Sequence, residues 1–172
     1  MKSLVDHLSQ YATYHRDPRN IASHFIGIPL IMVAVAVLLS RPQWAGGWLS
    51  PAVLVSLASA WFYLRLELRL GVLMSVLLGL SVWAGQTLAQ QSTLVWLSSG
   101  IGMFVVGWVI QFVGHYYEGR KPAFVDDVSG LIVGPLFVVV ELMFLVGLRH
   151  DLKEQIEARA GGVRINPKRA AA

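Results

Sequence analysis

Long stretches of this 172-residue chain contain no charged residue. Asp, Glu, Lys and Arg are absent from 20–40, 42–64 and 70–117, and a polar break at 90–93 divides the last stretch. A helix needs about 20 mainly apolar residues to cross a bilayer. The pattern predicts an all-α fold, a polytopic membrane helical bundle with about four transmembrane helices. The expected spans are 22–40, 46–65, 70–89 and 94–116.

A further apolar stretch, 128–148, contains one charged residue, Glu141. If it does not cross the membrane, 13 of the 14 Lys and Arg residues face one side and only Arg41 faces the other. If it crosses, the split becomes seven to seven. The positive-inside rule favours the first arrangement, with both termini cytoplasmic. We therefore interpret 128–148 as a re-entrant or interfacial helical segment with its break at Gly134-Pro135.

The composition supports a membrane protein, because 55% of residues are hydrophobic and only 14% are charged. Soluble domains carry about a quarter charged residues. The net charge of +4 is spread over short loops and the C-terminal end, so it does not indicate nucleic-acid binding. With no cysteine, the chain has neither disulfides nor a thiolate metal site. We expect one membrane-embedded domain over 1–160 and a disordered basic tail over 161–172. The membrane would be the inner membrane in a bacterium or the endoplasmic reticulum in a eukaryote.

Three histidines lie at the same predicted membrane face: His15, His24 and His115. Ionisable groups near hydrocarbon are usually functional, and histidine is the commonest ligand of transition metals. His115 and Glu118 are three residues apart on one helix, a spacing at which both side chains can bind one metal. Two or three histidines with a carboxylate approximate the ligand set of non-haem Fe(II) oxygenases.

Other interpretations of these residues stay open. A histidine near a helix end is often only an interfacial hydrogen-bonding group, and Glu118 could instead pair with Arg120 or Lys121. Glu141 is either a partner of a ligating histidine or a neutral, hydrogen-bonded acid. We expect further side chains to contact the ligating residues and hold them in place. We also expect Asn20 to cap the first span. These supporting candidates are His7, Tyr11, Asn20, Gln111 and Glu141.

Two blocks of residues resemble a known family. The first block holds Tyr14-His15, Pro18, Asn20, His24 and Pro29, and the second holds 111–115, Glu118, Pro122 and Ala123. Together with the later stretch 135–147, they are similar to the family of yeast 2-hydroxy-palmitate dioxygenase. The resemblance extends over nearly the whole chain, although the spans between the blocks match only in apolar character.

The resemblance implies an Fe(II)-dependent dioxygenase that shortens 2-hydroxy fatty acids by one carbon in an alpha-oxidation. Its lipid substrate and O₂ would be the partners, and the metal would be held by His15, His24 and His115, with Glu118 as a fourth ligand. The yeast member of the family has two adjacent histidines where this chain has His15-Arg16, and if the second of them matters, the metal ligands here differ. The substrate carboxylate is expected to meet a basic side chain. The candidates are Arg16, Arg19, Arg120 and Lys121.

Two functions of other classes compete with this enzyme. A small membrane transporter or metal-ion carrier would use the histidines to relay a proton or cation, but transporters place such groups near the midplane and often contain repeats. Here the histidines gather at one face and no repeat is visible. A non-catalytic lipid-binding scaffold would keep its function after substitution of His15, His24 and His115 together.

Overall fold

The computed structural model describes residues 2–169, and within that range it is all-helical, which confirms the predicted fold class. The described residues also contain three short 3-10 turns. The strand-like pairing among them is a single β-bridge between Trp44 and Leu49. The helices are α1 (Leu4–Ala12), α2 (Pro18–Leu39), α3 (Pro51–Leu66), α4 (Leu68–Ala89), α5 (Thr93–Glu118), α6 (Gly130–Leu145) and α7 (His150–Ala160).

Three helices, α2, α4 and α5, are long and apolar enough to cross a membrane, with 22, 22 and 26 residues. At 1.5 Å per residue each exceeds the hydrocarbon thickness of about 30 Å. The second expected span, 46–65, is instead the 16-residue helix α3. It begins late because Gly46 and Gly47 have positive φ, after which Ser50 caps the helix and Pro51 occupies its first turn.

The chain forms two compact units, whose boundaries fall within α2 and α5. The unit Pro29–Trp108 contains α3 and α4, a hairpin joined at Glu67. A side chain on Gly71 would lie 2.5 Å from the Leu64 backbone, so glycine there lets the two helices pack closely. In the same unit Arg41 donates to the carbonyl of Ala89, the last residue of α4, and to that of Gln91 in the turn that follows. Its guanidinium also lies over the Trp96 ring, so it holds the turn between α4 and α5 in place.

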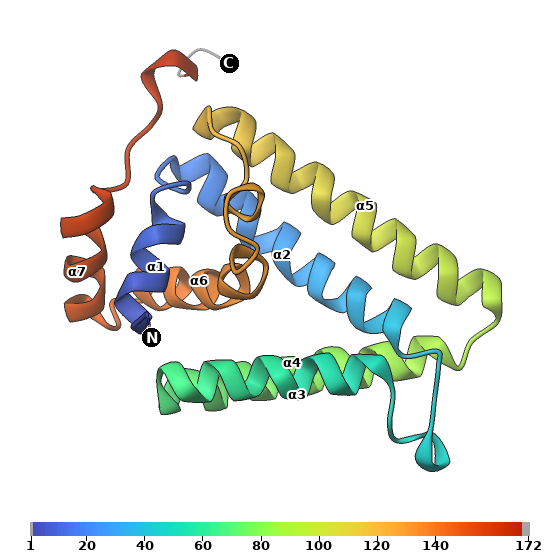
Figure 1. Ribbon diagram of the computed structural model, residues 1–172. Coiled ribbons are helices and arrows are strands. Elements are labelled where there is room, and N and C mark those ends of the chain that lie inside the picture. The colour runs from blue at the N-terminus through green and yellow to red at the C-terminus, as the bar shows by residue number, and fades with distance from the viewer. Residues whose placement is uncertain (1, 170–172) are drawn as a thin grey trace. The chain divides into compact units, whose positions relative to one another are not determined.

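The other unit, Met1–Ile28 with Val109–Ala172, contains α1, α6, α7 and the adjoining ends of α2 and α5. Helix α1 lies beside α6 and α7 (Figure 1). Ser3 and Asp6 form a capping box at its start, and Leu8 and Ala12 are fully buried on its inner face. The α7 side of this core is built from Leu152 and Ile156.

The break expected at Gly134-Pro135 is wrong, because α6 continues through both residues. Pro135 lies in the second turn, where its missing N–H removes a single helical hydrogen bond. Gly134 serves packing instead, since a side chain there would lie 2.8 Å from the Tyr11 hydroxyl. The chain bends by 117° between α6 and α7, where Gly147 and Arg149 both have positive φ.

The predicted division into a domain over 1–160 and a tail stays a prediction. Residues 161–169 follow α7 with a short 3-10 turn at Pro167–Arg169. The last part of the predicted tail, 170–172, lies outside the described residues.

Candidate metal centre

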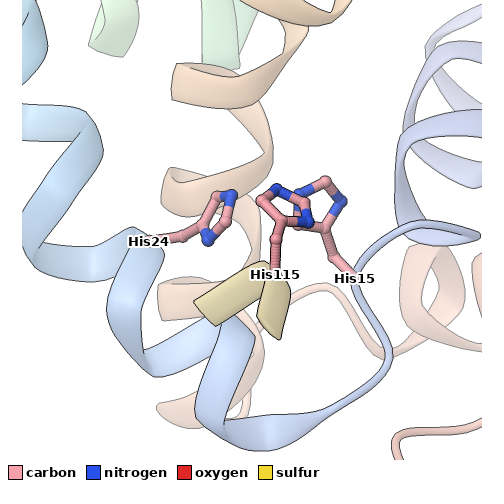
Figure 2. A group of neighbouring side chains, drawn as sticks. All are labelled: His15, His24 and His115. Atoms are coloured by element: carbon pink, nitrogen blue, oxygen red, sulfur yellow. The ribbon is translucent and has the colours of Figure 1, made fainter. Parts of the chain in front are cut away.

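Three buried histidines converge within the unit that contains α1. His15 lies in the loop between α1 and α2, His24 on the first turns of α2, and His115 near the end of α5. One nitrogen from each ring lies within 4.8 Å of the others, and the ring centroids are 4.4 to 5.2 Å apart. Figure 2 shows the three rings turned toward one another. The sequence therefore identified side chains that the fold does bring together.

Tyr11 holds the His15 ring at one edge and on one face. Its Nδ1 donates to the Tyr11 carbonyl oxygen at 2.7 Å, and its face stacks on the Tyr11 ring at 4.1 Å with an interplanar angle of 5°. Because a carbonyl oxygen can only accept, the proton is on Nδ1 and Nε2 carries the lone pair. That Nε2 is buried and has no hydrogen-bond partner among residues 2–169. Burial and the neighbouring histidines hold the pKa of His15 well below its usual value, so the ring is neutral, the form that binds metals.

His24 is oriented in the same way. Its Nδ1 donates to the Asn20 carbonyl oxygen at 2.8 Å, one turn earlier on α2, which leaves Nε2 as the lone-pair nitrogen. His115 Nδ1 is buried and also lacks a partner in the described part of the chain. Backbone carbonyls behind ligating histidines fix the ring orientation and raise the basicity of the opposite nitrogen. The donor set therefore fits a divalent transition metal.

A glycine lets α5 approach α2 at this site. A side chain on Gly114 would lie 2.6 Å from Asn20 Oδ1 and closer still to Ser23 Oγ. The helices can therefore touch only where residue 114 has no Cβ. This contact places the next residue, His115, against His24.

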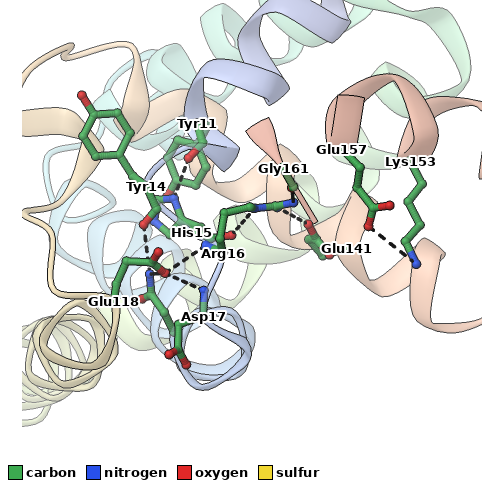
Figure 3. Close-up of polar contacts among 11 residues, drawn as sticks. Tyr11, Tyr14, His15, Arg16, Asp17, Glu118, Glu141, Lys153, Glu157 and Gly161 are labelled. Atoms are coloured by element: carbon green, nitrogen blue, oxygen red, sulfur yellow. Dashed lines mark hydrogen bonds and ion pairs between the residues drawn. The ribbon is translucent and has the colours of Figure 1, made fainter. Parts of the chain in front are cut away.

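Glu118, the expected fourth ligand, has its carboxylate engaged with the loop that carries His15. Its Oε2 accepts from the Arg16 backbone N–H at 2.9 Å, the Asp17 backbone N–H at 2.8 Å and Asn20 Nδ2 at 3.1 Å. Figure 3 shows the first two of these contacts. Glu118 is not part of the three-histidine group found among the described residues.

The cap of α2 is Asp17, so the expectation for Asn20 is wrong. Asp17 Oδ1 accepts the Arg19 backbone N–H at 2.9 Å, and Pro18 occupies the first helical position. Asn20 lies inside the first turn, where its Nδ2 donates to the Tyr14 carbonyl as well as to Glu118. Asn20 thus orients the His24 ring through its own backbone carbonyl.

Glu141 pairs with Arg16, which is neither of the two roles considered for it. The Arg16 Nη2 to Glu141 Oε1 distance is 3.2 Å, and both side chains are about nine-tenths buried. Arg16 also donates to the His15 and Gly161 carbonyl oxygens (Figure 3). A buried ion pair next to His15 therefore fixes the loop from the α6 side.

The other basic candidates for a substrate carboxylate each have a partner in the protein. Arg19 pairs with Asp17 at 3.0 Å, and its guanidinium lies 4.3 Å from the Tyr117 ring centroid. Arg120 donates to the Thr13 carbonyl at 2.8 Å, and Lys121 pairs with Asp126.

The two remaining supporting candidates lie in different surroundings. His7 lines a small pocket between α1 and α6, whose wall also includes Tyr11 and Asp127. Gln111 lies on α5 one turn before His115 and is buried, with its Nε2 lacking a partner within residues 2–169.

The segment after α7 contacts the site, which the sequence pattern did not predict. The Arg164 backbone N–H donates to the Arg16 carbonyl at 2.8 Å. Asn166 donates from its backbone to Asp17 Oδ2 and from its side chain to the Glu118 carbonyl, both at 2.8 Å. No motif marks these residues, and their polar composition is typical of disorder.

Comparisons with known proteins show the family to which the chain belongs. A family model described as 2-hydroxy-palmitic acid dioxygenase Mpo1-like matches residues 1–146. The 2-hydroxy-palmitic acid dioxygenase of Saccharomyces cerevisiae is 35% identical over 161 residues, which cover 91% of this chain and 90% of the yeast protein. No solved structure matches the chain significantly.

Proposed function

Since this chain belongs to the Mpo1-like family of 2-hydroxy-palmitic acid dioxygenases, we propose that it is an Fe(II)-dependent dioxygenase acting on 2-hydroxy fatty acids. Its product is the fatty acid one carbon shorter. The atoms balance with one O₂ per turnover: R–CH(OH)–COOH and O₂ give R–COOH, CO₂ and H₂O. The carbinol carbon becomes the new carboxyl carbon, and the old carboxyl carbon leaves as CO₂.

One observation carries this proposal, the convergence of His15, His24 and His115 in one buried cluster, where a ring nitrogen of His15 and one of His115 have no partner within residues 2–169. Three neutral nitrogen ligands suit Fe(II) and leave coordination positions open for a substrate. When bound, Fe(II) would supply the redox chemistry that O₂ requires and a Lewis-acidic centre for the 2-hydroxy acid. Substrate and O₂ are the partners that this reaction needs.

The protein's own contribution is orientation and exclusion of water. The carbonyls of Tyr11 and Asn20 hold two imidazoles in one tautomer, and Glu118 fastens the loop that carries His15. The centre is closed to water, because the exposed fractions of the three histidines are 0%, 2% and 5%. We assign Glu118 to positioning the loop, because its carboxylate already accepts three hydrogen bonds.

The proposed location is an integral membrane protein with both termini cytoplasmic. Its support is the distribution of basic residues around four apolar helices, α2 to α5, of which α2, α4 and α5 are each long enough to span and α3 is shorter. The acyl chain of the substrate would then lie among apolar helices while its head group reaches the histidines.

The first test measures bound iron in the purified protein after anaerobic loading, for the native chain and for His115→Ala. We expect about one iron per native chain and loss of that iron in the variant. His150→Ala is the matched control, because His150 is exposed at the start of α7. O₂ consumption and formation of pentadecanoate from 2-hydroxypalmitate then test the reaction. A native chain that binds no iron would overturn the proposal and favour the transport or scaffold functions.

A further inference from the structure

The buried face of α5 near its end contains one polar side chain besides His115. Gln111 is 3% exposed and His115 5%, whereas Phe112 and Val113 between them are 53% and 50% exposed. Residues four apart on a helix lie on the same face. Gln111 therefore belongs to the same buried surface as the histidine cluster, one turn earlier on α5.

The side-chain amide of Gln111 offers a donor that nothing in the described chain accepts. Five buried side-chain polar atoms lack a partner within residues 2–169, and two of them are ring nitrogens of His15 and His115. Among the five, Gln111 Nε2 is the one atom that can only donate. A buried donor without an acceptor costs stability, so its presence beside the cluster indicates an acceptor that arrives with a ligand.

A 2-hydroxy acid would bring a carboxylate to this place, and the cations nearby are already paired. Arg16 forms a buried pair with Glu141, and Arg19 is held by Asp17. Freeing either one would leave a carboxylate without its partner, which is strongly unfavourable in a buried site. An uncharged amide can bind a carboxylate oxygen without that penalty, and hydrogen bonds to charged oxygens are the stronger kind.

We propose that Gln111 positions the substrate by donating a hydrogen bond from Nε2 to the carboxylate of a 2-hydroxy fatty acid bound at His15, His24 and His115. This inference rests on the proposed function. It explains why Gln111 Nε2, one turn from His115, is a buried donor without a partner in the described residues. It also assigns recognition of the substrate carboxylate to α5 in place of the basic candidates Arg16, Arg19, Arg120 and Lys121.

The decisive variant is Gln111→Leu, which keeps the approximate size of the side chain and removes the donor. We expect iron content to stay at one per chain and the melting temperature to be unchanged or higher, because a buried polar group without a partner is removed. The dissociation constant for 2-hydroxypalmitate, measured anaerobically with the iron-loaded protein, should rise roughly 10- to 100-fold.

Two comparisons isolate the carboxylate. Hexadecane-1,2-diol keeps the hydroxyl and the alkyl chain but lacks the carboxylate, so Gln111→Leu should leave its affinity unchanged. Gln111→Glu places a second carboxylate against the first and should weaken binding of the acid more than leucine does. Gln155→Leu, at an exposed position on α7, is the matched control and should bind the acid as the native chain does.

The inference is overturned if Gln111→Leu binds 2-hydroxypalmitate as tightly as the native chain. It is also overturned if the variant loses iron or melts lower, since Gln111 would then be structural, or if the diol loses affinity as much as the acid. A native chain that binds iron and the acid while Gln111→Leu does so equally well refutes this inference alone. A native chain that binds neither refutes the proposed function, and this inference with it.

Discussion

The Tyr11 ring lies parallel to the His15 ring at 4.1 Å, and the Tyr11 carbonyl accepts a hydrogen bond from His15 Nδ1 at 2.7 Å. One residue of α1 thus fixes both the plane and the tautomer of His15. The ring and the carbonyl can be separated by mutation, because only the ring belongs to the side chain.

Tyr11→Phe keeps the stacked ring and should retain iron with little change in stability. Tyr11→Ala removes the ring, opens a cavity beside Phe137 and should destabilise the protein by about 3–5 kcal/mol while lowering iron affinity. Thermal unfolding and iron titration check both effects. Equal iron affinity in the two variants would show that the ring does not orient His15.

Gly114→Ala should prevent α5 from approaching α2, because the added carbon would overlap Asn20 and Ser23. Overpacking of this kind costs about 1–3 kcal/mol, and here it also moves His115 away from the other ligands. We expect a lower melting temperature and loss of iron. Gly102→Ala is the matched control on the same helix, since a side chain there meets nothing within 4 Å. Full iron content in Gly114→Ala would contradict the close approach.

Glu118→Gln should retain about one iron per chain, because an amide oxygen can still accept from the loop N–H groups. Glu118→Ala removes the acceptor and should cost about 2 kcal/mol, with weaker iron binding as the loop loosens. Elemental analysis and thermal unfolding distinguish the two, and Glu154→Ala, exposed on α7, serves as a control. Loss of iron in Glu118→Gln comparable to that in His115→Ala would instead make Glu118 a ligand.

Asp6 gives α1 a pH-dependent attachment. Hydrogen bonds from the Ser3 backbone and hydroxyl, and then from Arg159, lower the pKa of Asp6 from 3.8 to about 2. The folded state therefore holds its proton less tightly than the unfolded state, and the stabilisation is present above about pH 4 and is lost as the pH falls toward 2. Asp6→Asn should melt below the native chain at pH 7, and this difference should shrink between pH 4 and pH 2. If the difference in melting temperature were the same at pH 7 and at pH 2, the pH-dependent stabilisation by Asp6 would be refuted.

The absence of cysteine makes the topology directly testable with single introduced cysteines. Gln43 and Gln91 lie in exposed connections between helices, and Gly162 follows α7. The three single variants are Gln43→Cys, Gln91→Cys and Gly162→Cys. With four crossings and cytoplasmic termini, an impermeant maleimide added to intact cells should label the first two and spare the third. Labelling of Gly162→Cys from outside would show that 128–148 crosses the membrane.

The fold class and the three histidines could be predicted because both depend on patterns along the chain. Windows without charge predict apolar helices, and the position of each histidine in its window predicts its depth. The second span was predicted too long because glycines at 46 and 47 have φ values that end helical pairing, a feature that hydropathy does not record.

Partnerships between distant polar residues could not be predicted. Glu118 shares a helical face with His115, and its engagement by the Arg16 and Asp17 backbones depends on where the loop after α1 lies. Arg16 was a candidate for the substrate carboxylate, yet Glu141 reaches it from far along the chain. Gly134-Pro135 looked like a break because both residues disfavour helices, but close packing on Tyr11 explains the glycine.

The order in which the histidines occur along the chain has a consequence for biosynthesis. His15 and His24 emerge early from the ribosome, whereas His115 follows only after α3, α4 and most of α5 have been made. The complete set of three imidazoles therefore exists only once α5 has entered the bilayer. Iron binding would then indicate that membrane insertion is complete. A nascent chain that stops before α5 would lack His115 and would be unable to hold the metal.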